Sequence, residues 1–107
     1  MNQDSNNLNF QKLYHEHFNS PMPDECKELE EIDGIDPLLL DYSISSVLVA
    51  VSPKSTLRDY EQHRLLKECV HDLEIILPHL SGVSLDYFSR LNQISQHVLK
   101  HAFMRAK

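Results

Sequence analysis

Glycine and cysteine are scarce in this sequence, and their scarcity argues against two kinds of site. The two glycines, Gly34 and Gly82, stand apart from each other, so the chain has no glycine-rich loop that could cradle a phosphate. The two cysteines, Cys26 and Cys69, lie 43 residues apart without CxxC spacing. That spacing indicates two free thiols rather than a disulfide framework or a zinc site.

Long hydrophobic runs are also missing. The longest uninterrupted apolar run covers only residues 47–51, far short of a membrane span. Residues 1–10 are rich in asparagine and lack the charged-then-apolar layout of a signal peptide. We therefore expect an intracellular protein with no membrane partner.

The charge of the chain is unevenly distributed. The formal net charge is -6 over 107 residues, and residues 1–36 hold nine acidic side chains against two lysines, which leaves the remainder close to neutral. An acidic segment repels phosphate backbones, and no basic stripe with interleaved aromatic residues occurs elsewhere. The sequence therefore predicts no direct binding to nucleic acid.

Residues 1–35 read as an acidic, mostly disordered arm. Residues 1–7 are polar, and residues 19–34 are acidic and interrupted by Pro21-Met22-Pro23. The exception is a short amphipathic helix over about residues 8–18, whose apolar face comprises Phe10, Leu13, Tyr14 and Phe18. A helix this short is marginal alone, so its face needs either the chain's own core or another protein. The sequence leaves both possibilities open.

The helical domain is expected over residues 36–107. Asp36 can cap a helix whose first position suits Pro37, and apolar residues then recur at helical spacing: Leu40, Ile44, Val47, Leu48 and Val51. This pattern predicts a helix over residues 37–51. A strand through residues 46–51 is the alternative, because that stretch is rich in β-branched residues and apolar on both faces.

Two longer helices follow and form a hairpin. Thr56 and Asp59 make a capping-box pattern at the start of a helix that Pro78 should end near Leu77. After a turn at Gly82, a final helix is predicted from Ser84 toward Lys107, with heptad-like apolar spacing. The sequence thus predicts an all-α fold: a small three-helix domain with a C-terminal antiparallel helical hairpin, preceded by a partly disordered acidic N-terminal arm.

The search for catalytic or metal-binding chemistry gives no strong candidate. His97 and His101 share a helix face at i, i+4 spacing, but there is no HExxH pattern and no third ligand at a recognisable interval. Cys69 belongs to an apolar stripe, where a buried thiol is inert. Acidic side chains in a solvated arm lack the burial that tunes acidity. We predict no enzyme activity, no metal site and no cofactor.

A protein-binding role is favoured by size. About 70 ordered residues seldom supply more than roughly 3 to 5 kcal/mol from a single core, so apolar side chains beyond that core usually mark a partner surface. We predict partner contacts at both ends of the chain, through Phe10, Leu13, Tyr14, Phe18, Val98, Leu99, Ala102, Phe103 and Arg105.

The C-terminal sequence His97-Val98-Leu99-Lys100-His101-Ala102-Phe103-Met104-Arg105, together with the small size, acidic arm and helical hairpin, resembles the small adaptor subunits of fungal kinetochores that help load the centromeric histone. The resemblance implies a nuclear adaptor at the centromere. It also implies that a terminal helix docks on a β-propeller histone chaperone through Val98, Leu99, Ala102, Phe103 and Arg105.

Two other partner arrangements fit the same pattern. The chain could be a coiled-coil hairpin subunit that joins other helical subunits in a nuclear or cytoplasmic assembly, such as a transcription, tethering or cytoskeletal complex. It could also form a homodimeric four-helix bundle from two hairpins.

Overall fold

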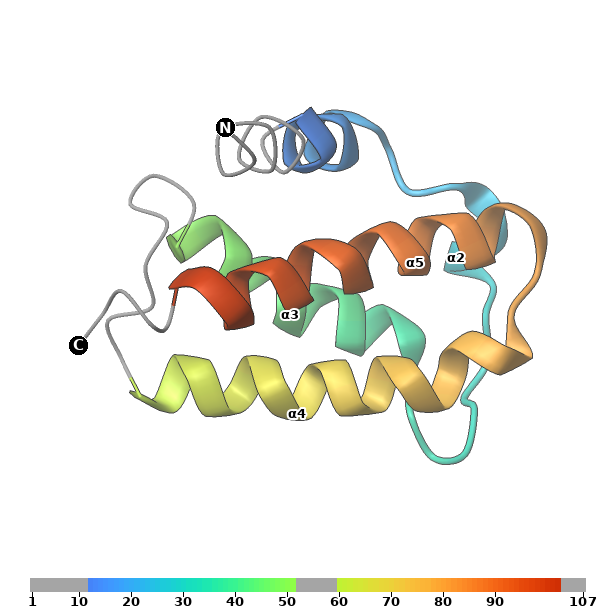
Figure 1. Cartoon of the computed structure of the whole chain (residues 1–107). Coiled ribbons are helices and arrows are strands. Elements are labelled where there is room, and N and C mark those ends of the chain that lie inside the picture. The colour runs from blue at the N-terminus through green and yellow to red at the C-terminus, as the bar shows by residue number, and fades with distance from the viewer. Residues whose placement is uncertain (1–11, 52–59, 103–107) are drawn as a thin grey trace.

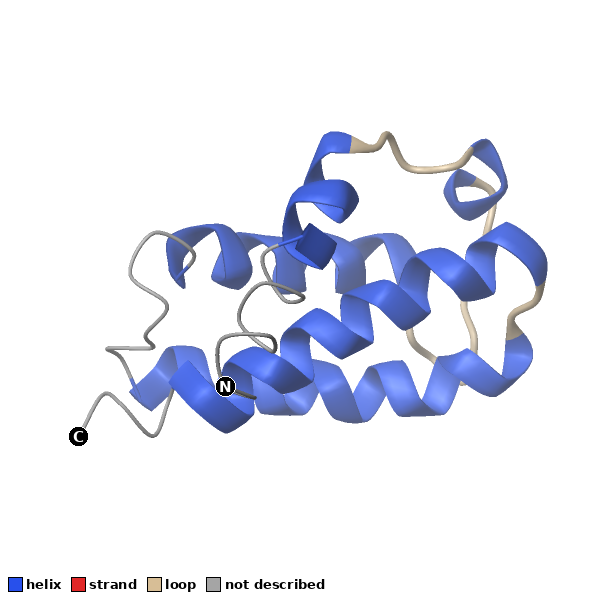
Figure 2. Cartoon of the chain, turned by 45° about the horizontal axis from the view of Figure 1, so that its top comes forward, coloured by secondary structure: helices blue, strands red, loops and turns tan. Residues whose placement is uncertain are grey.

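The computed structural model describes residues 12–51 and 60–102 (Figure 1). Within these ranges the chain is a small all-α domain, as predicted. Three helices lie side by side: α3 (Pro37–Val51), α4 (Tyr60–Ile76) and α5 (Gly82–His97). Loops and turns join the helical parts that the structure describes (Figure 2). Within one of these connections, Ile32 and Ile35 form an isolated β-bridge.

Helix α3 begins as its sequence predicts. The carboxylate of Asp36 accepts a hydrogen bond from the Leu38 N–H at 3.0 Å, and the Asp36 carbonyl accepts one from the Leu40 N–H at 3.0 Å. The predicted inward stripe is also confirmed, because four of its members are buried: Leu40, Ile44, Val47 and Leu48. The alternative of a strand over residues 46–51 is wrong. Val47 and Leu48 are buried and Val49 is exposed, so the apolar run covers both the inner and the outer side of the helix.

Helices α4 and α5 form the predicted antiparallel hairpin (Figure 1). Helix α4 ends at Ile76, and Pro78 lies in the 3-10 turn Leu77–His79 that follows. Proline cannot donate a backbone hydrogen bond and its ring collides with the preceding turn, so the helix tightens and stops there. The capping pattern of Thr56 and Asp59 lies outside the described residues.

Helix α5 starts two residues earlier than predicted. Ser81 occupies the N-cap position and Gly82 is the first helical residue, with a φ of 59° that glycine adopts without strain. Ser84, expected as the start, is buried, and its hydroxyl faces Cys26 instead of the helix end. Because its side chain points into the core, Ser84 does not cap the start of α5.

Beyond His97 the chain does not continue as the regular α-helix that the sequence predicts. A π-helical turn, Val98–Ala102, follows His97. Such a turn accommodates an extra residue, so the face presented by the chain shifts relative to a regular heptad pattern. The predicted helical course from residue 103 to Lys107 lies outside the described residues.

The core is shared by all three helices. Phe88, the largest fully buried side chain, comes from α5. The fully buried aliphatic residues come from α3, α4 and α5: Ile44, Leu48, Leu66, Leu73, Ile76, Leu91 and Ile94. Each helix therefore loses a packed face if any other is removed.

The described part of the N-terminal segment packs on this bundle, which differs from the mostly disordered arm that the sequence predicts. A helix over residues 12–19 lies across α3 and α5, and the one-turn helix α2 (Asp24–Lys27) follows (Figures 1 and 2). Cys26 is fully buried, and four more apolar residues pack partly against the core: Met22, Leu29, Ile32 and Ile35. These residues recur every three or four positions, so they point inward while the acidic residues between them face solvent.

A tight turn holds the last part of this segment. Ile32 and Ile35 exchange two backbone hydrogen bonds of 2.9 Å each. Between them, Asp33 and Gly34 both have positive φ, 52° and 82°. Asp-Gly is the favoured pair for a turn that needs positive φ at both central positions.

We predict that Gly34→Val lowers the free energy of unfolding by about 1 to 2 kcal/mol, because a β-branched residue is strained in the left-handed region. Equilibrium urea unfolding measures this change. Gly34→Asn is the matched control, since asparagine tolerates that conformation. Equal losses for the two variants would contradict the assignment.

Candidate functional site

The predicted N-terminal contact residues face the chain's own core. Leu13, Tyr14 and Phe18 are partly buried against it. The Tyr14 hydroxyl donates a hydrogen bond to the Leu48 carbonyl at 3.3 Å, and its ring centroid lies 4.6 Å from that of Phe18. The sequence leaves open whether this helix packs on the chain's own core or on another protein. In the structure it packs on the chain's own core. Phe10 lies outside the described residues.

The predicted C-terminal contact residues divide into two groups. Val98 is buried, and Leu99 packs partly against the core. The side chain of Ala102, and all of Phe103 and Arg105, lie outside the described residues. Docking of this segment on a β-propeller therefore stays a prediction from the resemblance.

His17 is the one histidine among the described residues that is buried, with 2% of its surface exposed. Its ring lies 4.6 Å from that of Tyr87 and 5.1 Å from that of Phe18, centroid to centroid. Neither ring nitrogen has a hydrogen-bond partner among the described residues. Burial, with a smaller contribution from the positive charge of Arg90, lowers the pKa of His17 from 6.5 to about 4, so the ring is neutral at physiological pH.

Tyr87 joins α5 to α3 beside this histidine. Its hydroxyl donates a hydrogen bond of 2.9 Å to the Asp41 carboxylate, and the Arg90 guanidinium lies 5.8 Å from its ring centroid. Burial raises the pKa of the Asp41 carboxyl, and the hydrogen bond from Tyr87 partly offsets this. Burial and the nearby Asp41 also raise the pKa of Tyr87. Tyr87 therefore keeps its proton and acts as a donor that ties two helices together.

The two thiols are free and buried. Cys26 donates a long hydrogen bond to the Ser84 hydroxyl, with 3.6 Å between sulfur and oxygen. Burial raises the pKa of Cys26 and raises that of Cys69 to about 11. Since the thiolate is the nucleophile, neither environment activates a cysteine for attack at neutral pH.

Metal ligands do not converge within residues 12–51 and 60–102: no three His, Cys, Asp or Glu side chains there are placed to hold one ion. His97 is half-buried at the end of α5, and the side chain of His101 lies outside the described residues.

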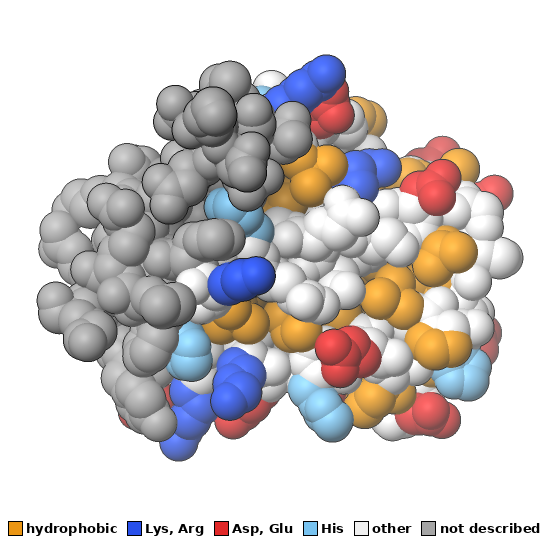
Figure 3. Space-filling model, in the orientation of Figure 1, with side chains coloured by type: hydrophobic (Ala, Val, Ile, Leu, Met, Phe, Trp, Pro, Cys, Tyr) orange, Lys and Arg blue, Asp and Glu red, His pale blue; other side chains and the backbone are white. Residues whose placement is uncertain are grey.

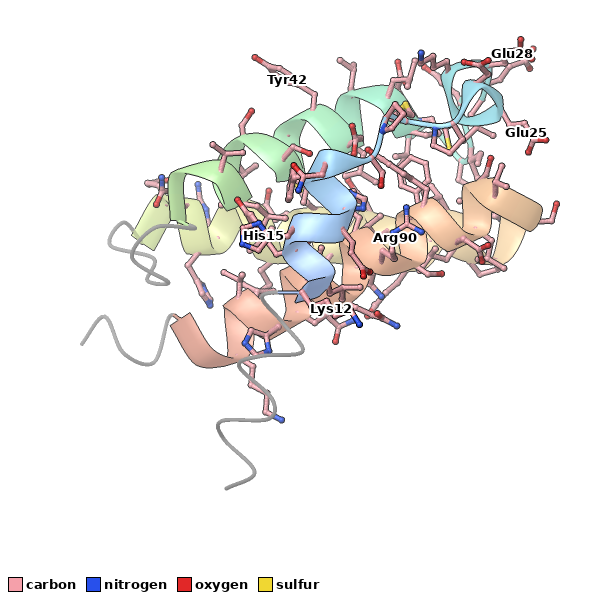
Figure 4. All side chains as sticks on the ribbon, turned by 90° about the horizontal axis from the view of Figure 1, so that it is seen from above. Lys12, His15, Glu25, Glu28, Tyr42 and Arg90 are labelled. Carbon is pink, nitrogen blue, oxygen red and sulfur yellow. The ribbon has the colours of Figure 1, made fainter. Side chains whose placement is uncertain are left out.

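The candidate functional surface is instead the outer face of α3. Leu39, Tyr42 and Val49 are 64%, 72% and 57% exposed, and Leu38 at 37% borders them. At 3.6 residues per turn these side chains, with exposed Ser46, occupy an arc opposite the buried stripe. Figure 4 shows Tyr42 pointing away from the bundle. We call residues 39, 42, 46 and 49 the α3 stripe.

No charged side chain interrupts the α3 stripe. The one charged residue of α3 is Asp41, which is half-buried and bonded to Tyr87. The Ser46 hydroxyl donates to the Tyr42 carbonyl at 2.9 Å, so its hydrogen bond is made within the helix. Covering the stripe would therefore bury no charge and break no hydrogen bond that the helix relies on.

The face formed by α4 and α5 has a different character. There, hydrophobic side chains are interspersed with charged and histidine side chains (Figure 3). Two large apolar residues of these helices are exposed, Leu65 and Val83, at 43% and 45%. They stand on separate helices, and singly exposed apolar residues of this kind are ordinary on protein surfaces.

Sequence reasoning missed the α3 stripe, although its signal was present. Apolar character on both faces of residues 46–51 fits a strand, but it fits equally a helix whose outer face is covered by a partner. The inward stripe was recognised because it continues without interruption, while the outer one is broken by Ser46.

Comparisons with protein-family models, with curated proteins and with solved structures gave no match to this chain. Within the residues that the structure describes, no helix combines the length and the apolar character that crossing a membrane requires.

We predict that His17 makes the fold sensitive to acid. The unfolded chain binds a proton near pH 6.5 and the folded chain only near pH 4, so the stabilising contribution is complete above the first value and is lost as the pH falls toward the second. The expected loss between about pH 7.5 and pH 5 is roughly 2 kcal/mol.

Urea unfolding of the wild type and of His17→Phe at both pH values isolates this contribution, because phenylalanine keeps a ring between Tyr87 and Phe18 but cannot titrate. The variant should lose less stability on acidification than the wild type. The same pH dependence in both proteins would contradict the role assigned to His17.

Proposed function

We propose that this chain is a non-enzymatic protein-binding module that docks an amphipathic helix along α3. The observation that carries the proposal is the α3 stripe, an uncharged and mostly apolar face opposite the face that builds the core. A helix that is apolar on both faces is normally covered on both faces. The core covers one, and a partner is proposed for the other.

The geometry of the stripe suits a helical partner. Its positions are separated by three, four and three residues, the spacing of a coiled-coil seam. A helix laid along such a seam inserts its own apolar side chains between those of α3. A strand has a period of two residues and would match this spacing poorly.

The stripe has its largest and its smallest side chain about one turn apart, which favours close packing with a partner. Tyr42 projects furthest, while Ser46 one turn later leaves room for a side chain of the partner. Covering each of Leu39, Tyr42 and Val49 contributes on the order of 1 kcal/mol, because each is only partly exposed to begin with. These contributions offset part of the cost of association.

A helical partner on α3 fits a subunit that joins other helical subunits better than one that docks on a β-propeller. The β-propeller reading depends on residues 98–105, of which Val98 and Leu99 face inward. The α3 stripe is independent of those residues. An adaptor in a multiprotein assembly would use it while the hairpin keeps its packed core.

The test is a photoreactive benzoylphenylalanine placed at Tyr42 in the full chain, expressed in its cell of origin. We expect a discrete protein adduct at this position, identified by mass spectrometry, because the side chain projects into the proposed interface. The matched control carries the same group at Val83, which is exposed on α5. No adduct at position 42, or the same adduct at both positions, would contradict the proposal.

A further inference from the structure

We infer that the helix docked on α3 is α3 of a second copy of this chain, antiparallel to the first, so that the protein is a symmetric dimer. This inference rests on the proposed function and names its partner. It follows from the symmetry of the stripe, from the acidic segment that leads into α3 and from the lack of charge along the stripe.

The spacing of the stripe reads the same in both directions. Residues 39 and 49 lie equally far from residue 44, as do residues 42 and 46. With a twofold axis beside residue 44, Leu39 of one copy faces Val49 of the other, and Tyr42 faces Ser46. Every contact then occurs twice, as a twofold interface requires.

The side chains paired in this way are complementary in size. Tyr42 is the largest and most exposed residue of the stripe, and Ser46 is the smallest. The antiparallel register places each tyrosine over the serine of the other copy, which fills the space that serine leaves. In a parallel pairing, Tyr42 would meet Tyr42 and Ser46 would meet Ser46, so one layer would be overfilled and another left empty.

Charge favours the same orientation. The segment leading into Pro37 is acidic, with exposed Glu25 on α2 and exposed Glu28 directly after it (Figure 4). Exposed Glu30, Glu31 and Asp33 follow. A parallel dimer would place two such ends together, and like charges would repel. An antiparallel dimer keeps them at opposite ends, and the stripe between them carries no charge that would meet its own copy.

Sedimentation equilibrium of the purified full chain tests the dimer. We expect a mass that approaches twice 12.4 kDa as concentration rises. Val49→Lys should raise the dissociation constant by roughly tenfold or more, because it places a charge in an apolar seam. Val83→Lys is the matched control, with the same replacement at a comparably exposed valine outside the stripe.

Circular dichroism of both variants checks that the fold is kept, which is expected because both valines are exposed and lysine suits a helix. A wild-type chain that stays monomeric, or a dimer weakened equally by the two replacements, would overturn the inference.

Disulfide trapping tests the orientation. Leu39→Cys and Val49→Cys chains, mixed and mildly oxidised, should form a covalent heterodimer, because these positions face each other. Each variant alone should remain unlinked, since its two equivalent positions would be ~15 Å apart along the helix, beyond the reach of a disulfide. The wild type is the blank, because Cys26 and Cys69 are buried. Efficient self-linking of Leu39→Cys alone would indicate a parallel pairing and overturn the inference.

The outcomes separate this inference from the proposed function. If the purified chain is monomeric and the adduct at position 42 contains a different protein, the docking role stands and the second copy is excluded. If the chain is dimeric and the adduct is a second copy of itself, both hold. If there is neither a dimer nor an adduct, both fail.

Discussion

The buried face of α5 is the constraint on which the rest of the structure depends. Phe88, Leu91 and Ile94 have no exposed surface because α3 and α4 pack around them. The N-terminal segment completes the enclosure, since His17 stacks on Tyr87 and Cys26 contacts Ser84. A core of this size leaves a thin margin of stability, so even short segments that cover α5 matter.

Two hydrogen bonds at this enclosure hold neighbouring helices in alignment. The bond from Tyr87 to Asp41 joins α5 to α3, and the bond from Tyr14 to the Leu48 carbonyl joins the first described helix to α3. Each hydrogen bond fixes the position of one helix along its neighbour, because apolar contacts alone are not directional. The acidic residues between positions 12 and 35 are all exposed, so this segment contributes to the core and keeps its negative charge in solvent.

The elements with strong local signals were predictable from the sequence. Asp36-Pro37 and the inward stripe predict α3, and Pro78 places the end of α4, because caps, prolines and periodicity act within one helix. The packing of residues 20–35 was not predictable from the sequence. The apolar residues of this segment are separated by acidic ones, and the segment is held by contacts with helices that lie far away in the sequence. The same limit applies to Ser84, whose burial depends on Cys26, 58 positions earlier. Among the site residues, Leu13, Tyr14 and Phe18 were recognised as a face in need of a partner, whereas the outer face of α3 was concealed by its serine.

The two apolar faces of α3 have a consequence for biosynthesis. During translation, residues 37–51 emerge from the ribosome before α4 and α5, which cover the buried face of α3 in the folded chain. At that stage both faces of α3 are uncovered. The acidic N-terminal segment is synthesised before this stretch, and its negative charge opposes association between neighbouring nascent chains. Charged residues that precede a hydrophobic stretch in this way oppose aggregation before a core or a partner covers it.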